Sequence, residues 1–164
     1  MRDIIRKKAT VSSVVVDHDD KLVKIKFDDN QTEVLLITEL VRIYDTANFA
    51  KLDVSEIEVG SIVSIYHREN TPMMMSMPPK YVPELIVVNN NEDFMSHKFM
   101  YFDQQLISAD SEIQISDDFL RLVESIEYRP LIKELLVDQE LLVFYQKSTK
   151  SLPAQVYPEK IIIL

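Results

Sequence analysis

Two stretches of this chain repeat one another, and this internal repeat is the feature that most constrains its fold. Residues 37–67 align with residues 115–145 without a gap, and removal of three residues from the first loop aligns 77–88 with 152–163. Each copy then has a proline, a Pro-Glu pair five residues later and a β-branched run. Self-similarity at a fixed spacing is typical of repeated units. We therefore predict two tandem modules, residues 1–90 and a diverged copy at 91–164, that meet at a polar run.

Apolar alternation predicts strands in both copies. Val23, Ile25 and Phe27 alternate with Lys24 and Lys26, which is the pattern of a half-buried strand. The first copy is predicted to contain strands at 9–17, 21–27, 33–44, 61–67 and 81–88, of which the strand at 33–44 could bend near Thr38-Glu39. The second is predicted to contain strands near 98–107, 111–116, 119–124, 139–146 and 156–163.

One short helix is expected in each copy. In the first, residues 52–59 follow a capping pattern, with Asp53 as N-cap, Glu56 three residues later and Gly60 as a left-handed stop. In the second, Pro130 precedes a helix at 131–137. Three strands, a helix and two strands are the order of an OB-like barrel. The predicted fold class is mostly β, with two tandem small OB-like partly closed barrels, each with one short helix; an SH3-like barrel or an open sandwich is the alternative.

The composition removes several classes of function. The chain contains one glycine, Gly60, whereas a phosphate-binding loop, a dinucleotide fingerprint and a nucleophile elbow each need several. It contains no cysteine, which excludes disulfides, zinc thiolates and cysteine nucleophiles. No catalytic motif is recognisable, so we expect a protein that is not an enzyme and that uses no cofactor.

The charge and hydropathy restrict the partners. The formal net charge is -9, which disfavours nucleic acid and anionic membrane surfaces. With 46% hydrophobic residues and no long apolar run, the chain is expected to be globular and to have no membrane span. The compartment stays open: extracellular or at the cell surface if a signal peptide was removed, otherwise cytoplasmic. The oligomeric state is open as well.

A methionine cluster lies in the loop before the last strand of the first copy. Clustered thioethers can bind Cu(I), so the candidate metal ligands are Met73, Met74, Met75 and Met77. Methionine between prolines also serves as an adaptable core filler or as a protein contact surface. The second copy has no methionine here. The candidate interaction loop consists of Pro72, Met73, Met74, Met75, Pro78, Pro79 and Tyr81.

Other candidate sites have weaker patterns. The acidic turn Asp17-His18-Asp19-Asp20 fails the EF-hand template, because Leu22 takes the position of its glycine. The three histidines, His18, His67 and His97, have no paired zinc spacing. The aromatic residues Tyr66, Tyr81, Phe99, Tyr101 and Phe102 could form a base-stacking platform, but this acidic chain lacks the basic groove that such a platform needs, and packing is the favoured role.

Residues 52–63 and 71–88 carry a resemblance to a known family. The segment Leu52 to Val63 resembles the Asp-Leu-Lys-x-Gly-Asp strand entry, and Met75 to Pro79 resembles the Met-Ser-x-Pro-Pro loop, of a β module in clostridial and related Firmicute proteins. Ser61 departs from that pattern, which has an acidic residue after the glycine. The resemblance implies a β module in secreted or cell-surface bacterial proteins, some beside domains like the N-terminal domain of copper amine oxidases. It implies no catalytic residue.

These observations lead to a ranked functional expectation. The first is a non-enzymatic binding or structural module that contacts protein, cell-wall material or its own second copy. The alternative is copper handling through the methionine loop. A nucleic-acid-binding OB protein is the third and weakest.

Overall fold

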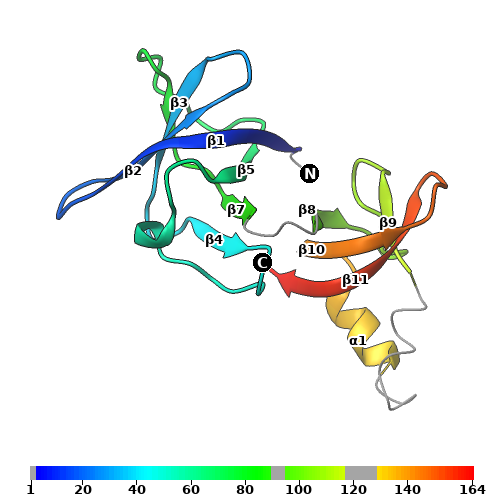
Figure 1. The fold of residues 1–164 in the computed structure, drawn as a ribbon. Helices are drawn as coiled ribbons and strands as arrows, with labels where there is room; N and C mark the ends of the chain where they lie inside the picture. Colours follow the sequence, from blue (N-terminus) through cyan, green and yellow to red (C-terminus); the bar gives the residue numbers. More distant parts are fainter. Residues whose placement is uncertain (1–2, 90–94, 117–128) are drawn as a thin grey trace. The chain divides into compact units, whose positions relative to one another are not determined.

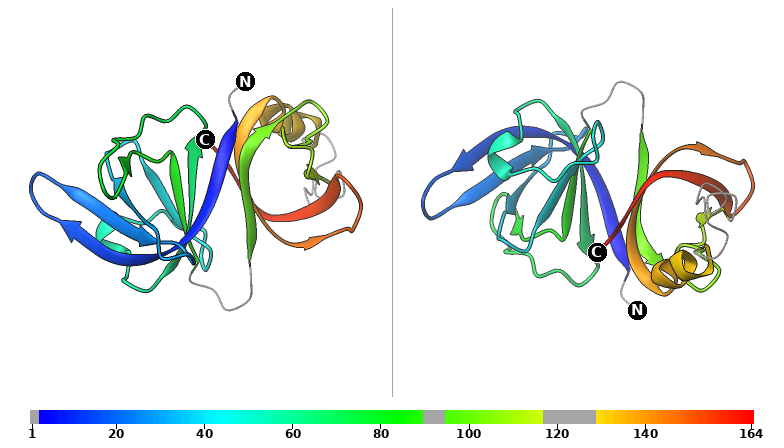
Figure 2. Two further views of the ribbon diagram at one scale, coloured as in Figure 1. Left: turned by 90° about the horizontal axis from the view of Figure 1, so that it is seen from above. Right: turned by 90° about the horizontal axis from the view of Figure 1, so that it is seen from below.

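The protein is mostly β: its described residues form two sheets, one of them curled into a half-barrel, and one short α-helix (Figure 1). This computed structural model describes residues 3–89, 95–116 and 129–164. The chain divides into two compact units, Met1–Glu92 and Asp93–Leu164, a division that falls beside the polar run where the modules were predicted to meet. Figure 2 shows the strands of each unit curving around that unit's own interior.

The first unit contains one seven-stranded sheet. Its strands are β1 (Ile4–Val16), β2 (Lys21–Lys26), β3 (Thr32–Leu36), β4 (Arg42–Asp45), β5 (Ile62–Arg68), β6 (Lys80–Tyr81) and β7 (Leu85–Asn89). They are ordered β4-β7-β5-β1-β2-β3-β6, and only the β3–β6 and β4–β7 pairs are parallel. Residues 82–84 alone separate β6 from β7, yet these two strands lie at opposite sides of the row. The sheet therefore has to curve back on itself.

The strand predicted at 33–44 is interrupted at the position where a bend was expected, and it forms two strands, β3 and β4. The Val41 N–H donates to the Thr38 carbonyl at 3.1 Å, and the Thr38 hydroxyl accepts from the Leu40 N–H at 3.3 Å. A threonine that binds backbone in this way favours a turn over continued pairing. Strand β3 therefore ends its pairing with β2 at Leu36, and the chain then forms β4, which pairs with β7. At the N-terminus, β1 begins at Ile4, earlier than the predicted residue 9.

The predicted helix at 52–59 is a single 3-10 turn, η1 (Val54–Glu56), in the structure. Asp53 caps it as expected, with its carboxylate accepting from the Ser55 N–H at 3.0 Å. The turn ends because Ile57 is extended and buried. Gly60 has φ +93°, the left-handed conformation predicted for the stop, and its N–H donates to the Val11 carbonyl at 2.8 Å.

The first core confirms the alternation in the sequence. Val23 and Ile25 are buried with exposed fractions of 1% and 0%, while Lys26 faces solvent. They join side chains of β1, β3, β5 and β7 and of the turn η1 in one apolar cluster. The first unit therefore has its own hydrophobic core.

The second unit has a four-stranded sheet and the helix. Its elements are β8 (Ser96–Phe102), β9 (Ile113–Ile115), α1 (Arg129–Leu136), β10 (Gln139–Ser148) and β11 (Ala154–Ile163). The strand order is β8-β10-β11-β9, with β9 parallel to β11. Phe102, Leu141 and Val143 are fully buried in a second apolar cluster. The expectation of a short helix in each module is thus corrected, since the described residues contain one α-helix, in the second unit.

Two predicted strands of the second unit change length. The strand expected at 98–107 ends at Phe102, because the Asp103 carboxylate accepts the N–H groups of Gln105 and Ile107 at 2.9 and 3.0 Å. Leu106 completes this turn with φ +59°. The strand expected at 111–116 is reduced to β9. The strand expected at 119–124 lies outside the described residues.

Candidate functional site

The methionine loop between β5 and β6 is fixed by hydrogen bonds. The backbones of Met74 and Lys80 exchange bonds of 2.8 and 3.3 Å, which forms a small bridge across the loop. At its tip the Ser76 hydroxyl donates to the Pro78 carbonyl at 2.7 Å. The backbone of this loop is therefore held in a defined conformation.

The methionines divide between the core and the solvent. Met73 packs against the first core, Met74 is 52% exposed, and Met75 and Met77 are 94% and 97% exposed. Pro72 is exposed, and Pro78 and Pro79 are partly buried. The tip thus presents two apolar side chains almost entirely to water.

Tyr81, expected in the interaction loop, lies in the core. Its exposed fraction is 2%, and its hydroxyl donates to Glu33 Oε1 at 2.8 Å. Burial, together with the neighbouring carboxylate, raises the pKa of Tyr81. The ring stabilises the base of the loop and is not presented to a partner.

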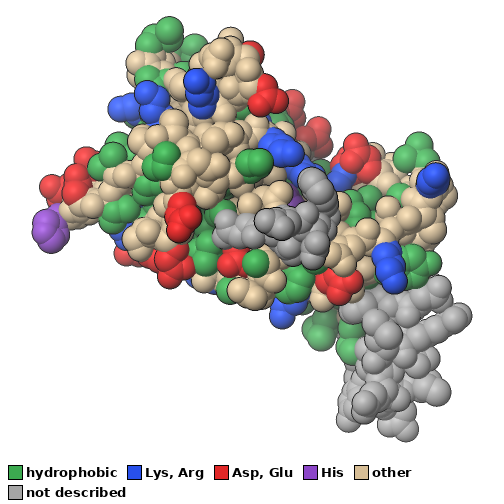
Figure 3. Space-filling model, viewed as in Figure 1, with side chains coloured by type: hydrophobic (Ala, Val, Ile, Leu, Met, Phe, Trp, Pro, Cys, Tyr) green, Lys and Arg blue, Asp and Glu red, His purple; other side chains and the backbone are tan. Residues whose placement is uncertain are grey.

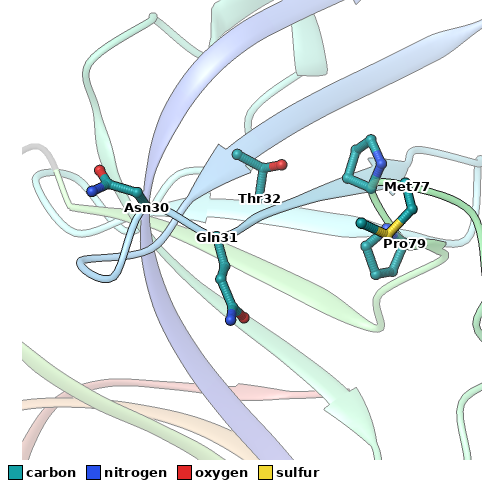
Figure 4. Close-up of a pocket in the computed structure, with 6 residues that line it drawn as sticks. Asn30, Gln31, Thr32, Met77 and Pro79 are labelled. Carbon is teal, nitrogen blue, oxygen red and sulfur yellow. The ribbon is translucent and has the colours of Figure 1, made fainter.

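A concavity of about 600 Å³ lies next to the tip. It is lined by Asn30, Gln31, Thr32, Met77, Pro78 and Pro79. Figure 4 shows Asn30, Gln31 and Thr32 on one side of this space and Met77 with Pro79 on the other. We call this space the tip groove; none of its lining side chains is charged.

A polar cluster lies on the inner face of the first unit's sheet, around the Tyr81 side chain. Lys7 Nζ is 3.2 Å from Glu33 Oε2, and it also lies 5.2 Å from the centre of the Tyr81 ring. The side chains of Lys7 and Glu33 are 26% and 16% exposed. Sequence reasoning missed this pair. The alternation of side chains along a strand could have revealed it. Lys7 lies on the same face of β1 as the buried residues Ala9 and Val11, and Glu33 lies on the same face of β3 as Leu35.

His67 is the fourth member of this cluster. It is 2% exposed, its ring packs edge-on against Tyr81 at 5.2 Å, and its Nδ1 lies 2.8 Å from the Arg68 carbonyl oxygen. That contact places the ring proton on Nδ1. Within the described part of the chain, Nε2 is buried and has no hydrogen-bond partner. Desolvation lowers the pKa of His67, and Lys7 lowers it further, while the Arg68 carbonyl and Glu33 oppose this.

We expect His67 to make the protein less stable in mild acid. Its pKa in the folded state lies below the 6.5 of an exposed histidine, so the unfolded chain binds a proton first as the pH falls. The stabilisation is complete above pH 6.5, declines below it, and stops declining beneath the folded-state pKa. Urea unfolding between pH 7.5 and 5 measures this slope. The His67→Gln variant should have a shallower slope, and an unchanged slope would contradict the assignment.

Copper binding by Met73, Met74, Met75 and Met77 remains a prediction. Met73 packs on the core, so the three exposed thioethers are the ones free to bind Cu(I) without rearrangement. If the loop handles copper, competition titration with Cu(I) should give tight 1:1 binding that the quadruple Met→Leu variant abolishes. Equal binding by the Met73→Leu variant alone would indicate that the exposed three suffice. The absence of any competition would remove the copper hypothesis.

The second unit has a similar tip. Ser151 and Leu152 are the counterparts of Ser76 and Met77 in the repeat alignment, and the Ser151 hydroxyl donates to the Pro153 carbonyl at 3.0 Å. Leu152 is 84% exposed. The methionines are confined to the first copy, but an exposed apolar side chain at the tip occurs in both.

The remaining candidates have structural roles. Asp17 Oδ1 accepts the N–H groups of Asp19 and Asp20 at 2.9 and 2.6 Å, so this carboxylate closes its own turn. Over residues 3–89, 95–116 and 129–164, no group of three or more His, Cys, Asp or Glu side chains is placed to hold a metal ion. Phe99 and Phe102 of the proposed stacking platform are buried. On the face seen in Figure 3, acidic and basic side chains are interspersed.

The search for relatives and for membrane segments gave negative results. Comparison with known proteins finds no matching family model, no matching curated protein and no matching solved structure. In the portion of the chain that the structure describes, no helix has the length and apolar character needed to cross a membrane.

Proposed function

We propose that this chain is a non-enzymatic binding protein that contacts another protein through the tip of the methionine loop. The observation that carries the proposal is the near-complete exposure of Met75 and Met77 in a loop fixed by hydrogen bonds. A loop whose backbone is already fixed loses little backbone entropy when its tip is covered, and the flexible methionine side chains can adapt to varied surfaces.

The groove beside the tip favours protein over wall polysaccharide as the partner. Its lining combines side-chain amides and a hydroxyl with a thioether and two proline rings. Amides and apolar side chains suit a peptide, whereas the lining offers no aromatic ring on which a sugar could stack. The family resemblance, which implies a secreted or cell-surface bacterial protein, is compatible with a protein partner and with a wall polysaccharide.

We further propose that the fold behind the tips is a tandem pair of OB-type barrels. The support in the first unit is that β1 pairs with both β2 and β5, while β3 pairs in parallel with β6. The second unit repeats part of this arrangement: β8–β10 corresponds to β1–β5, β10–β11 to β5–β7, and the parallel β9–β11 pair to β3–β6. Gly60 and Asp138, equivalent in the repeat, both have positive φ. Loops of this fold commonly bind ligands.

Panning of a phage-displayed library of random linear peptides tests the binding function. We expect enrichment of peptides on the intact protein and loss of their retention by the Met75→Ser/Met77→Ser variant. Removing both apolar contacts from the centre of a small interface should weaken binding by about tenfold or more.

A matched control uses an apolar residue elsewhere in the same unit. Leu40 is 87% exposed and lies outside the groove, so Leu40→Ser should retain the peptides as the wild type does. Failure to enrich any peptide, or equal loss in both variants, would overturn the proposal. Retention on insoluble peptidoglycan that depends on Met75 and Met77 would replace protein with wall material as the partner.

A further inference from the structure

The edge of β3 is left unpaired where it borders the tip groove. The Phe27 N–H donates to the Gln31 carbonyl, and the Ile37 N–H donates to the Lys21 carbonyl, each at 2.9 Å. These two bonds flank the β2–β3 ladder, so the backbone groups of the odd-numbered residues of β3 point toward β2. Backbone groups alternate in direction along a strand. The N–H and C=O of Val34 and Thr32 therefore point to the other side, toward residues 77–80.

Only Val34 finds a partner on that side. Its N–H donates to the Pro79 carbonyl at 2.9 Å, and it pairs with Lys80 in the parallel ladder. Opposite Thr32 the chain is Pro78-Pro79, and a proline nitrogen has no hydrogen to donate. Among the described residues no backbone hydrogen bond crosses from Thr32 to 77–79. One N–H and one C=O thus face the groove.

We propose that the tip groove receives an extended, uncharged peptide segment that pairs its main chain with Thr32 and places an apolar side chain against Met77. This inference rests on the binding function proposed above and specifies the chemistry of the partner. The peptide would supply the N–H that the prolines cannot, and so extend the ladder of β3. Addition of a strand to a free sheet edge is an established mode of peptide recognition.

The lining determines which peptide fits. It contains no charged side chain, so a charged residue of the peptide would lose water without gaining an ion pair. The side chains of Asn30 and Gln31 can bond to peptide amides on the outer side. Figure 4 shows Thr32 between these amides and the proline segment, which is the position that a paired strand requires. A volume near 600 Å³ suits a short segment and not a folded surface.

An NMR titration with a synthetic peptide of an enriched sequence tests the inference. We expect the amide signal of Thr32 to move downfield and its hydrogen exchange to slow on binding, because the N–H gains an acceptor. N-methylation of one internal peptide residue should weaken binding by about tenfold, the effect of losing one well-placed hydrogen bond. N-methylation at the peptide's terminal residue is the matched control and should have little effect.

The outcomes separate this inference from the function on which it rests. If peptides bind in a manner that needs Met75 and Met77, but Thr32 is unchanged and no N-methyl position matters, the binding function stands and the strand pairing is overturned. If no peptide binds, both fail. A Thr32→Pro variant that keeps its β signal in circular dichroism should bind about tenfold more weakly, and unchanged affinity would count against the pairing. Shifts of the groove signals with soluble wall oligosaccharide alone would overturn the assignment to a peptide.

Discussion

Replacement of Phe102 by alanine is expected to unfold the second unit and leave the first unit folded. Phe102 is fully buried at the centre of the second core, beside Leu141 and Val143. Deletion of such a ring costs about 3–5 kcal/mol. A unit of this size, Asp93–Leu164, has only about that much stability to lose. In a two-dimensional NMR spectrum the amide signals of residues 95–116 and 129–164 should collapse to random-coil positions, while those of residues 3–89 keep their dispersion.

The separation of the two cores is the reason for this expectation. The first core draws its members from residues 9–88 and the second from residues 102–156, with no residue in common. Leu152→Ala is the matched control, because that side chain is 84% exposed and its loss should change stability by less than about 0.5 kcal/mol. Simultaneous loss of both sets of signals in Phe102→Ala would show that the two units unfold as one.

The parts of the fold that were predictable are those governed by alternation and by turn chemistry. Val23 and Ile25 alternate with lysines, and both are buried in β2 as predicted. Gly60 was predicted to be left-handed, and it is. Both predictions depend on residues within a few positions of one another, which is the range over which a single sequence is informative.

The errors arose where tertiary context decided the outcome. Residues 33–44 are predicted as one strand with a bend near Thr38-Glu39, and nothing local shows that residues 42–45 pair with β7. The length of the predicted helix at 52–59 failed for a similar reason. The side chains of Val54 and Ile57 both pack in the core. One 3-10 turn followed by extended backbone buries both of them. Burial of two anchors outweighed helix propensity there.

The site was predictable in its exposed part and missed in its buried part. The methionines stood out by composition, and two of them are nearly fully exposed. Tyr81 was grouped with them because it follows the prolines in sequence, although its strand position directs it inward. The groove depends on Asn30, Gln31 and Thr32, which precede Met77 by more than forty residues. Only the pairing of β3 with β6 brings these segments together.

Replacement of Glu33 by leucine is expected to lower the free energy of unfolding by about 2–3 kcal/mol. The change leaves Lys7 partly buried without its carboxylate and leaves the Tyr81 hydroxyl without its acceptor. Breaking a buried ion pair on one side costs about 3–5 kcal/mol, and the partial exposure of Lys7 reduces that figure. Urea unfolding at pH 7 measures the loss as a lower midpoint at unchanged slope.

The double variant Lys7→Met/Glu33→Leu distinguishes the cost of an uncompensated charge from the loss of a favourable attraction. If the cost arises from Lys7 left unpaired, removal of that charge as well should restore most of the stability, since apolar pairs often replace buried ion pairs without penalty. The Arg68–Glu84 pair is the matched control, because Glu84 is 45% exposed, and Glu84→Leu should cost less than about 1 kcal/mol. Equal small losses in Glu33→Leu and Glu84→Leu would mean that water screens the inner pair as fully as the outer one. A double variant as unstable as Glu33→Leu alone would instead assign the cost to the Tyr81 hydroxyl, whose acceptor neither leucine nor methionine can replace.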